Sequence, residues 1–160
     1  MHRSVMLEEV LVWLQPKAGG LYLDGTIGAG GHSRAILEAN GPEGRIIGLD
    51  RDAAAVDAAR QALMPFGDRV VIMQAHYRDA AQIVHDATTR GLDGAILDLG
   101  VSSMQVDQAA RGFSFMAEGP LDMRMDQRDA LTAADLVNRL PEKELIRILF
   151  EYGEERYARR

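Results

Sequence analysis

Short apolar runs alternate with segments of helical spacing over the first two-thirds of the chain. The apolar runs lie at residues 21–23, 45–49, 69–73 and 95–97, and the helical patterns at 5–14, 30–39, 53–63 and 79–89. Brief continuous apolar runs are typical of strands that are covered on both faces. Because strands that alternate with helices through short links form parallel sheets, this pattern predicts an α/β fold.

The alternation stops after Asp98. Residues 99–130 are rich in Gly, Ser, Asp and Met and show no clear period, which predicts a long functional loop or lid. Thr132 followed by Asp135 is a capping-box pattern that predicts a helix to about residue 140, and Pro141 begins a second helix to about residue 152. We therefore expect a core domain over residues 1–100 and a second region over residues 101–160.

Composition excludes some classes of protein. The 160 residues fit one ordinary domain, and 47% hydrophobic with 26% charged residues is typical of soluble globular proteins. No apolar run has the length that a bilayer requires, so we expect no membrane partner. The absence of cysteine removes disulfides and thiolate metal sites, and a cytoplasmic location is the simplest expectation. A net charge of −6 disfavours a broad nucleic-acid surface but leaves room for a local one.

Polar residues follow the predicted strands where each one ends. Asp24, Asp50 and Asp98 end three strands, and Tyr77 follows the remaining one. In open parallel sheets, ligands bind beyond the carboxyl ends of the strands. The first strand also leads into the glycine-rich segment DGTIGAGGHS at residues 24–33, which opens a helix whose free N–H groups can hold an oxygen atom. These features together predict a site for a nucleoside-type cofactor.

The glycine-rich loop bears on the choice of cofactor. The dinucleotide pattern G-x-G-x-x-G fails, because Ser33 stands at the third glycine position after Gly28 and Gly30. Asp24 would oppose a pyrophosphate but suits the ammonium and sulfonium charges of S-adenosylmethionine. Asp50 can accept hydrogen bonds from both ribose hydroxyls, as a carboxylate does in NAD enzymes too. We expect S-adenosylmethionine, with an NAD-dependent oxidoreductase as the alternative.

Further side chains complete the predicted site. Tyr77 can pack on the adenine face, and Asp98 and Gln105 can contact the cofactor or a substrate amine. His32 has no second histidine or carboxylate at ligand spacing, so we expect it to contact the cofactor and predict no metal site.

Seven short motifs resemble one known family. They are MLEEV from Met6, DGTIGAGGHS from Asp24, LDRD from Leu49, LDLGVSS from Leu97, RGFSF from Arg111, GPLDMRMD from Gly119 and YGEER from Tyr152. In this order they resemble the bacterial ribosomal RNA small subunit methyltransferase H family, also called MraW. The resemblance implies a Rossmann-like class I S-adenosylmethionine-dependent fold that methylates the N4 amine of a cytidine in the decoding region of 16S ribosomal RNA.

The resemblance also assigns residues and partners. It implies that 16S ribosomal RNA or the small ribosomal subunit is the partner, and it places the cofactor-contacting positions on Gly30, Gly31, His32, Asp50, Tyr77, Asp98 and Gln105. Tyr77 stands where some relatives carry Phe, and Met104 where Pro is frequent. Family members continue for about as many residues again, so we expect this chain to be an incomplete sheet followed by the start of a helical insertion. An unpaired sheet edge would then favour a homodimer. The alternative function is a cofactor-binding fragment without activity on its own.

The implied reaction suggests roles for the remaining candidates. Asp98 can accept hydrogen bonds from the cytosine amine, and the alternative is that the cofactor uses all of its hydrogen-bonding capacity. Ser102 or Ser103 can orient the base. The target base must leave its stack, and RNA-binding proteins stack such bases on aromatic or guanidinium planes. We therefore predict RNA contacts by Arg111, Phe113, Phe115 and Arg124. The alternative for Arg111, Phe113 and Phe115 is a hydrophobic anchor for the loop. The alternative for Arg124, which stands between Asp122 and Asp126 in the sequence, is a structural ion pair.

Overall fold

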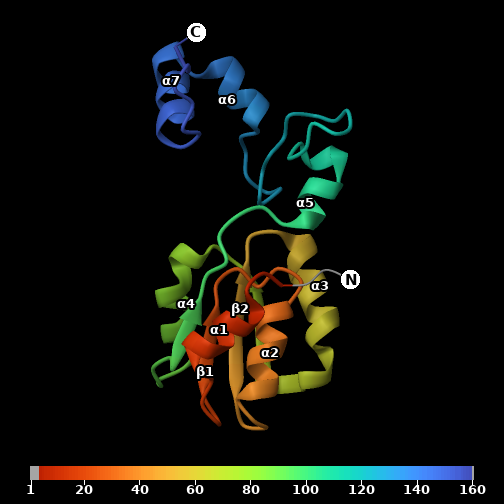
Figure 1. Cartoon of the computed structure of the whole chain (residues 1–160), viewed down its shortest axis with the longest axis vertical. Coiled ribbons are helices and arrows are strands. Elements are labelled where there is room, and N and C mark those ends of the chain that lie inside the picture. The colour runs from red at the N-terminus through yellow and green to blue at the C-terminus, as the bar shows by residue number, and fades with distance from the viewer. Residues whose placement is uncertain (1–3, 160) are drawn as a thin grey trace. The chain divides into compact units, whose positions relative to one another are not determined.

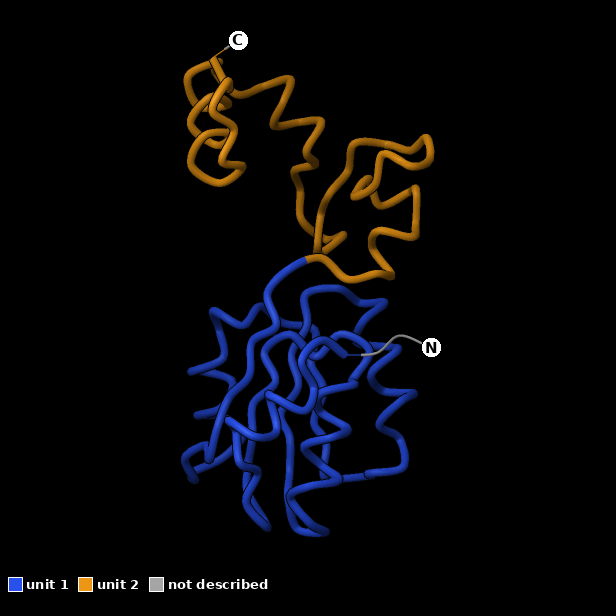
Figure 2. The backbone as a smooth tube through the Cα atoms, viewed as in Figure 1, with its two compact units in different colours: residues 1–100 blue, residues 101–160 orange. Residues whose placement is uncertain are grey.

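Two compact units make up the chain in the computed structural model, which describes residues 4–159. The division falls after Gly100 (Figure 2). Unit 1 ends at Gly100, and unit 2 comprises residues 101–160. Among the described residues, no helix combines the length and the apolar character that crossing a bilayer requires.

A four-stranded parallel sheet forms the centre of unit 1. Its strands are β1 (Leu21–Asp24), β2 (Arg45–Asp50), β3 (Val70–Gln74) and β4 (Gly94–Ile96), in the spatial order β3-β2-β1-β4. Leu23 of β1 pairs with Ile47 of β2 and with Ala95 of β4, so β1 lies inside the sheet and receives hydrogen bonds on both sides. The predicted α/β fold with a parallel sheet is confirmed.

Helices cover both faces of this sheet (Figure 1). They are α1 (Leu7–Leu14), α2 (Gly31–Ala39), α3 (Ala53–Leu63) and α4 (Ala80–Ala87), with 3₁₀ turns η1 (Met64–Arg69) and η2 (Tyr77–Asp79). Tyr22 and Ile46 point to one face, where they pack with Leu63 and other residues of α1, α2 and α3. Leu23 and Ile47, each one residue later, point to the opposite face, which α4 covers. Alternation along the strands thus produces two apolar layers, as a sheet buried on both faces requires.

Element ends differ from the sequence predictions at two places that matter for the site. The first helix begins at Leu7 rather than at residue 5, because Met6 adopts a left-handed conformation with φ 53° and turns the preceding residues away from the helix axis. Strand β4 ends at Ile96, so Asp98 lies two residues beyond the strand instead of at its end. The backbone at Asp98 is therefore positioned by other contacts, described below.

Unit 2 is built from short helices. They are α5 (Ser103–Asp107), η3 (Ala109–Arg111), α6 (Ala133–Arg139) and α7 (Glu142–Glu151). The last two confirm the predicted pair of helices, and the capping box of Thr132 and Asp135 forms at the start of α6. The prediction of an irregular loop over residues 99–130 is wrong for α5 and η3. A second capping box, in which Ser102 and Gln105 satisfy each other's backbone N–H groups, begins α5.

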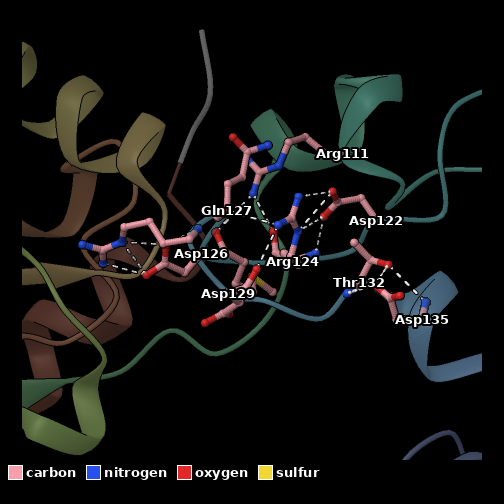
Figure 3. A network of polar contacts seen from close by, with 10 residues as sticks. Arg111, Asp122, Arg124, Asp126, Gln127, Asp129, Thr132 and Asp135 are labelled. Carbon is pink, nitrogen blue, oxygen red and sulfur yellow. Dashed lines mark hydrogen bonds and ion pairs between the residues drawn. The ribbon is translucent and has the colours of Figure 1, made fainter. Parts of the chain in front are cut away.

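Arginine side chains cross-link the segment between η3 and α6 (Figure 3). The Arg124 guanidinium donates to both carboxylate oxygens of Asp122, with 2.7 Å between Nη2 and Oδ2, and its Nη1 donates to the carbonyls of Gln127 and Asp129. Arg111 is buried, and its Nη2 donates to the Arg124 carbonyl at 2.9 Å. Charge-assisted hydrogen bonds of this kind are the stronger ones in proteins, so this network organises a segment that has little regular structure.

The ion pair between Asp122 and Arg124 should change how the Asp122 carboxyl titrates in acid. Hydrogen bonds from Arg124 lower the pKa of the Asp122 carboxyl from 3.8 to about 2. The stability that ionised Asp122 contributes is therefore present above pH 3.8 and is lost as the pH falls through about 2. NMR titration of the carboxyl carbon should give an Asp122 midpoint near 2, and Arg124→Gln should move it towards 3.8.

Arg128→Gln is the matched control for this titration. Arg128 pairs with Asp126 at 2.6 Å, so its removal should leave the Asp122 midpoint where it was. An unaltered chain in which Asp122 titrates at its ordinary pKa of 3.8 would show that the network does not form in solution.

Candidate functional site

Asp50 joins the end of β2 to the glycine-rich loop. Its Oδ2 accepts the Gly28 N–H at 2.9 Å, and its Oδ1 accepts the Asp52 N–H at the same distance. Each carboxylate oxygen can accept more than one hydrogen bond, so both oxygens keep capacity for a further donor. The half-buried Asp50 therefore holds the loop in place and can still accept two neighbouring hydroxyl groups.

Asp24 lies beneath the glycine-rich loop rather than at its surface. It is 2% exposed, its Oδ2 accepts the Ser33 hydroxyl at 2.7 Å, and its Oδ1 accepts the Thr26 N–H at 3.2 Å. Burial raises the pKa of the Asp24 carboxyl, and the Ser33 and Thr26 hydrogen bonds oppose that rise. The sequence predicts a direct cofactor contact here, but in the structure both carboxylate oxygens are used inside the protein. Its observed role is to connect β1, the loop and α2.

The start of α2 supplies the backbone donors of the site. Gly30 has φ 85°, a conformation that side chains disfavour, and a Cβ atom there would lie 3.1 Å from Leu63 of α3. The first hydrogen bond of the helix runs from the Arg34 N–H to the Gly30 carbonyl. The N–H groups of Gly31 and the next residues therefore precede the helical ladder, where they can bind an anionic oxygen.

Tyr77 lies next to the first glycine of the loop. A Cβ atom built on Gly25 would come within 3.1 Å of the Tyr77 Cβ and 2.4 Å of a Leu97 methyl group, so only glycine allows this close approach. Tyr77 begins η2, three residues beyond the last residue of β3, and is 38% exposed. Its partly open ring beside the loop is compatible with the predicted packing on a planar base.

Asp98 is held at the edge of the site by the loop itself. Its backbone N–H donates to the Thr26 Oγ1 at 2.7 Å, and its side chain is 54% exposed. The His32 ring lies nearby, with 4.0 Å between Nδ1 and the Asp98 Oδ2. The other ring nitrogen, Nε2, is 2.9 Å from the Val5 carbonyl oxygen. The eight predicted cofactor residues of unit 1 thus lie in or against one loop, namely Asp24, Gly28, Gly30, Gly31, His32, Asp50, Tyr77 and Asp98.

Three of the predicted cofactor-binding or catalytic residues belong to unit 2. Ser102 caps α5 with its hydroxyl, which accepts the Gln105 N–H at 3.2 Å, and Ser103 is the first residue of that helix. Gln105 is 4% exposed; its Oε1 accepts the Ser102 N–H, and its Nε2 lies 3.3 Å from the Met125 sulfur. The mutual contacts of Ser102 and Gln105 therefore cap the start of α5, and Gln105 also contacts Met125.

The four predicted RNA-binding residues have different surroundings. Arg111 and Arg124 donate to acceptors inside unit 2: Arg111 to the carbonyls of Arg124 and Met125, and Arg124 to the Asp122 carboxylate. Phe113 is half-buried, and the Arg111 guanidinium lies 5.9 Å from its ring centroid. Phe115 is 98% exposed, so it does not anchor the loop. The alternative of a structural ion pair for Arg124 is confirmed with Asp122, at 2.7 Å between Nη2 and Oδ2, and Asp126 pairs with Arg128.

Sequence reasoning did not identify three residues that shape the site. Thr26 and Ser33 lie within the glycine-rich segment, and their hydroxyls bind Asp98 and Asp24. A signal was present, because two hydroxyl residues flank glycines directly after a strand. Val5 contributes only its backbone carbonyl to His32, and no side-chain pattern could have indicated that contact.

Comparison with known proteins identifies the family of this chain. The sequence profile of the MraW methylase family matches residues 1–160. Ribosomal RNA small subunit methyltransferase H of Geobacter sp. (strain M21) is 55% identical over 159 residues, which cover 99% of this chain and 51% of the relative. The protein of the same name from Syntrophotalea carbinolica is 54% identical with the same coverage. The chain thus spans about half the length of these curated relatives.

A solved structure supports the fold alone. The crystal structure of NSun6 from Pyrococcus horikoshii with SFG has a TM-score of 0.51 and 18% identity, and the similarity covers 61% of this chain and 24% of that chain. The profile match over residues 1–160 and the 55% identity to a curated relative are much stronger evidence of kinship than this structural similarity. On that basis, the chain belongs to the MraW methylase family.

Proposed function

We propose that this chain carries the S-adenosylmethionine-binding half of an enzyme that methylates the N4 amine of a cytidine in small-subunit ribosomal RNA. The observation that carries the proposal is the hydrogen bond between the Gly28 N–H and the Asp50 carboxylate. It joins a ribose-type acceptor to a glycine-rich loop at the carboxyl ends of adjacent parallel strands, where α/β proteins bind nucleosides. Family membership and the names of the relatives support ribosomal RNA as the substrate of the proposed methylation.

The residues of unit 1 suit each part of this cofactor. Asp50 would accept the ribose hydroxyls, the Tyr77 ring would pack on adenine, and the N–H groups at the start of α2 would bind the carboxylate of the methionine end. Asp98 supplies an exposed negative charge for the positively charged end. When bound, the cofactor would supply an activated methyl group, so the protein mainly has to position donor and acceptor.

The acceptor amine is a weak nucleophile, because its lone pair is delocalised into the cytosine ring. A carboxylate that accepts an amine N–H favours a more localised lone pair. The Asp98 carboxylate is 54% exposed and its backbone is fixed by Thr26, so it can serve the amine as well as the cofactor. In unit 2, Phe115 presents a nearly fully exposed ring, which suits stacking with an unpaired base.

Ligand titration tests the cofactor. Calorimetry should show that the chain binds S-adenosylmethionine and does not bind NAD. Asp50→Ala should raise the Kd for S-adenosylmethionine by roughly tenfold or more, because hydrogen bonds to a charged acceptor are lost. Asp50→Asn keeps one acceptor oxygen and should cost less.

Asp57→Asn provides the control for this titration. Asp57 is exposed on α3 and pairs with Arg60, so its replacement should leave cofactor affinity unchanged. Tight binding of NAD with no response to S-adenosylmethionine would support an oxidoreductase and reject the proposed function.

A methyl-transfer assay tests the substrate. Small ribosomal subunits that lack the modification would be incubated with tritiated S-adenosylmethionine and this chain joined to the second half of the Geobacter sp. (strain M21) relative. We expect label in N4-methylcytidine after nuclease digestion, and much less label with the 160-residue chain alone. Label in a different nucleoside would refute N4 specificity, and no label with the joined protein would refute the proposed activity.

A further inference from the structure

A short loop in unit 2, residues 112–119, has a neck at which backbone lies directly against backbone. Gly112 has φ 72°, and a Cβ atom there would lie 2.4 Å from the Pro120 carbonyl oxygen. A Cβ atom on Gly119 would lie 2.1 Å from the Ala109 carbonyl oxygen. Cβ atoms do not come so close to an oxygen, so only glycine fits at both ends. We call residues 112–119 the tip loop.

Arg111 anchors the neck of the tip loop to the rest of unit 2. Its side chain is 4% exposed and donates to the Arg124 carbonyl at 2.9 Å and to the Met125 carbonyl at 3.2 Å. Its own carbonyl accepts the Met123 N–H at 3.0 Å, which closes the loop. The guanidinium also lies 5.9 Å from the Phe113 ring centroid. The base of the loop is therefore fixed, so a partner need not order it.

The tip of this loop presents two large apolar side chains to solvent. Phe115 is 98% exposed and Met116 is 84% exposed. The Met116 N–H donates to the Ser114 hydroxyl oxygen at 3.2 Å, which is a contact that stabilises turns. Neither side chain belongs to the two buried apolar clusters found among residues 4–159. A compact loop that exposes apolar side chains in this way is typical of a binding element.

The size and charge of the tip favour nucleic-acid bases as its partner. Two side chains are far fewer than the roughly 20 residues that each side of a stable protein interface supplies. Segments that lie in a lipid surface are typically rich in Lys and Arg, whereas the one charged residue of the tip loop is Glu118. Its negative charge also opposes phosphate groups, which leaves the faces of the bases as the part of RNA that the tip can bind. Phe and Met are among the side chains that proteins insert between stacked bases.

We propose that Phe115 and Met116 form a wedge that enters the base stack of the substrate RNA and fills the gap that the extruded target cytidine leaves. The wedge rests on the proposed function, in which the target base leaves its stack. It differs from a platform, on which Phe115 would stack with the extruded base itself. A wedge replaces the stacking that the neighbours of the target lose, so it stabilises the open form of the RNA.

An abasic target separates a wedge from a platform. Small subunits would be reconstituted on 16S ribosomal RNA with an abasic residue at the position that the methyl-transfer assay labels, and the Kd of the joined protein would be measured. We expect Phe115→Ala to weaken binding to abasic subunits by at least about fivefold, because the gap is still present when the target base is missing. Met116→Ala should weaken it by about twofold or more, because less apolar surface is buried. Phe115→Trp should retain wild-type affinity.

Two glycine substitutions test the neck. Gly112→Ala should reproduce the loss of affinity for abasic subunits, because a Cβ atom there would displace the chain on the other side of the neck. Gly91→Ala is the matched control, because a Cβ atom built there meets no described atom within 4 Å. Phe115→Ala and Met116→Ala should keep the melting temperature and the Kd for S-adenosylmethionine of the unaltered protein, since both side chains are exposed.

The two substrates distinguish the possible results. If Phe115→Ala binds abasic subunits normally but intact subunits weakly, Phe115 is a platform and the wedge is overturned. Wild-type affinity of Phe115→Ala on both substrates, or of Met116→Ala on abasic subunits, would overturn it as well, and wild-type affinity of Gly112→Ala would contradict the role of the neck. If the unaltered joined protein transfers no methyl group, the proposed function itself fails. If it transfers methyl groups and Phe115→Ala binds abasic subunits normally, only the wedge fails.

Discussion

Carboxylates that accept backbone N–H groups at the ends of β1 and β2 are the constraint on which the site depends. A loop at the edge of a buried sheet has polar backbone groups that the strands no longer satisfy, and such groups must find other partners. Asp50 accepts hydrogen bonds from the N–H groups of Gly28 and Asp52. Asp24 accepts hydrogen bonds from the Thr26 N–H and from the Ser33 hydroxyl. These bonds fix the glycine-rich loop before any ligand arrives, so the ligand need not bear the cost of ordering it.

The two carboxylates have different roles because their burial differs. Asp24 is 2% exposed and its two oxygens accept the Thr26 N–H and the Ser33 hydroxyl, so its observed contribution to the site is the support of the loop. Asp50 is half-buried and keeps lone pairs for a ligand, and Asp98 is more exposed still. Exposure of these carboxylates thus increases in the order Asp24, Asp50, Asp98. In unit 2, an ion pair between Asp122 and Arg124 cross-links a segment that has little apolar core.

Much of this architecture was predictable from local sequence. The four strands, the helices of unit 1 and the capped helix α6 follow from apolar spacing and from the Thr132–Asp135 pattern, which depend on near neighbours. Helix α5 has only five residues, too few for a period, yet its Ser102–Gln105 capping box has the S-x-x-Q spacing and was a readable signal. The burial of Asp24 and Arg111 was not predictable, because their environments depend on how separate segments pack in three dimensions. For the same reason, no sequence pattern indicated the contact between His32 and the Val5 carbonyl.

A crystal structure of the chain with S-adenosylmethionine would test the central claim most directly. The account predicts that the ribose hydroxyls lie within hydrogen-bonding distance of Asp50, while Asp50 still accepts the Gly28 N–H and Asp24 stays bonded to Ser33 and Thr26. A cofactor bound away from Asp50, or an Asp24 side chain that leaves Ser33 to contact the ligand, would contradict it.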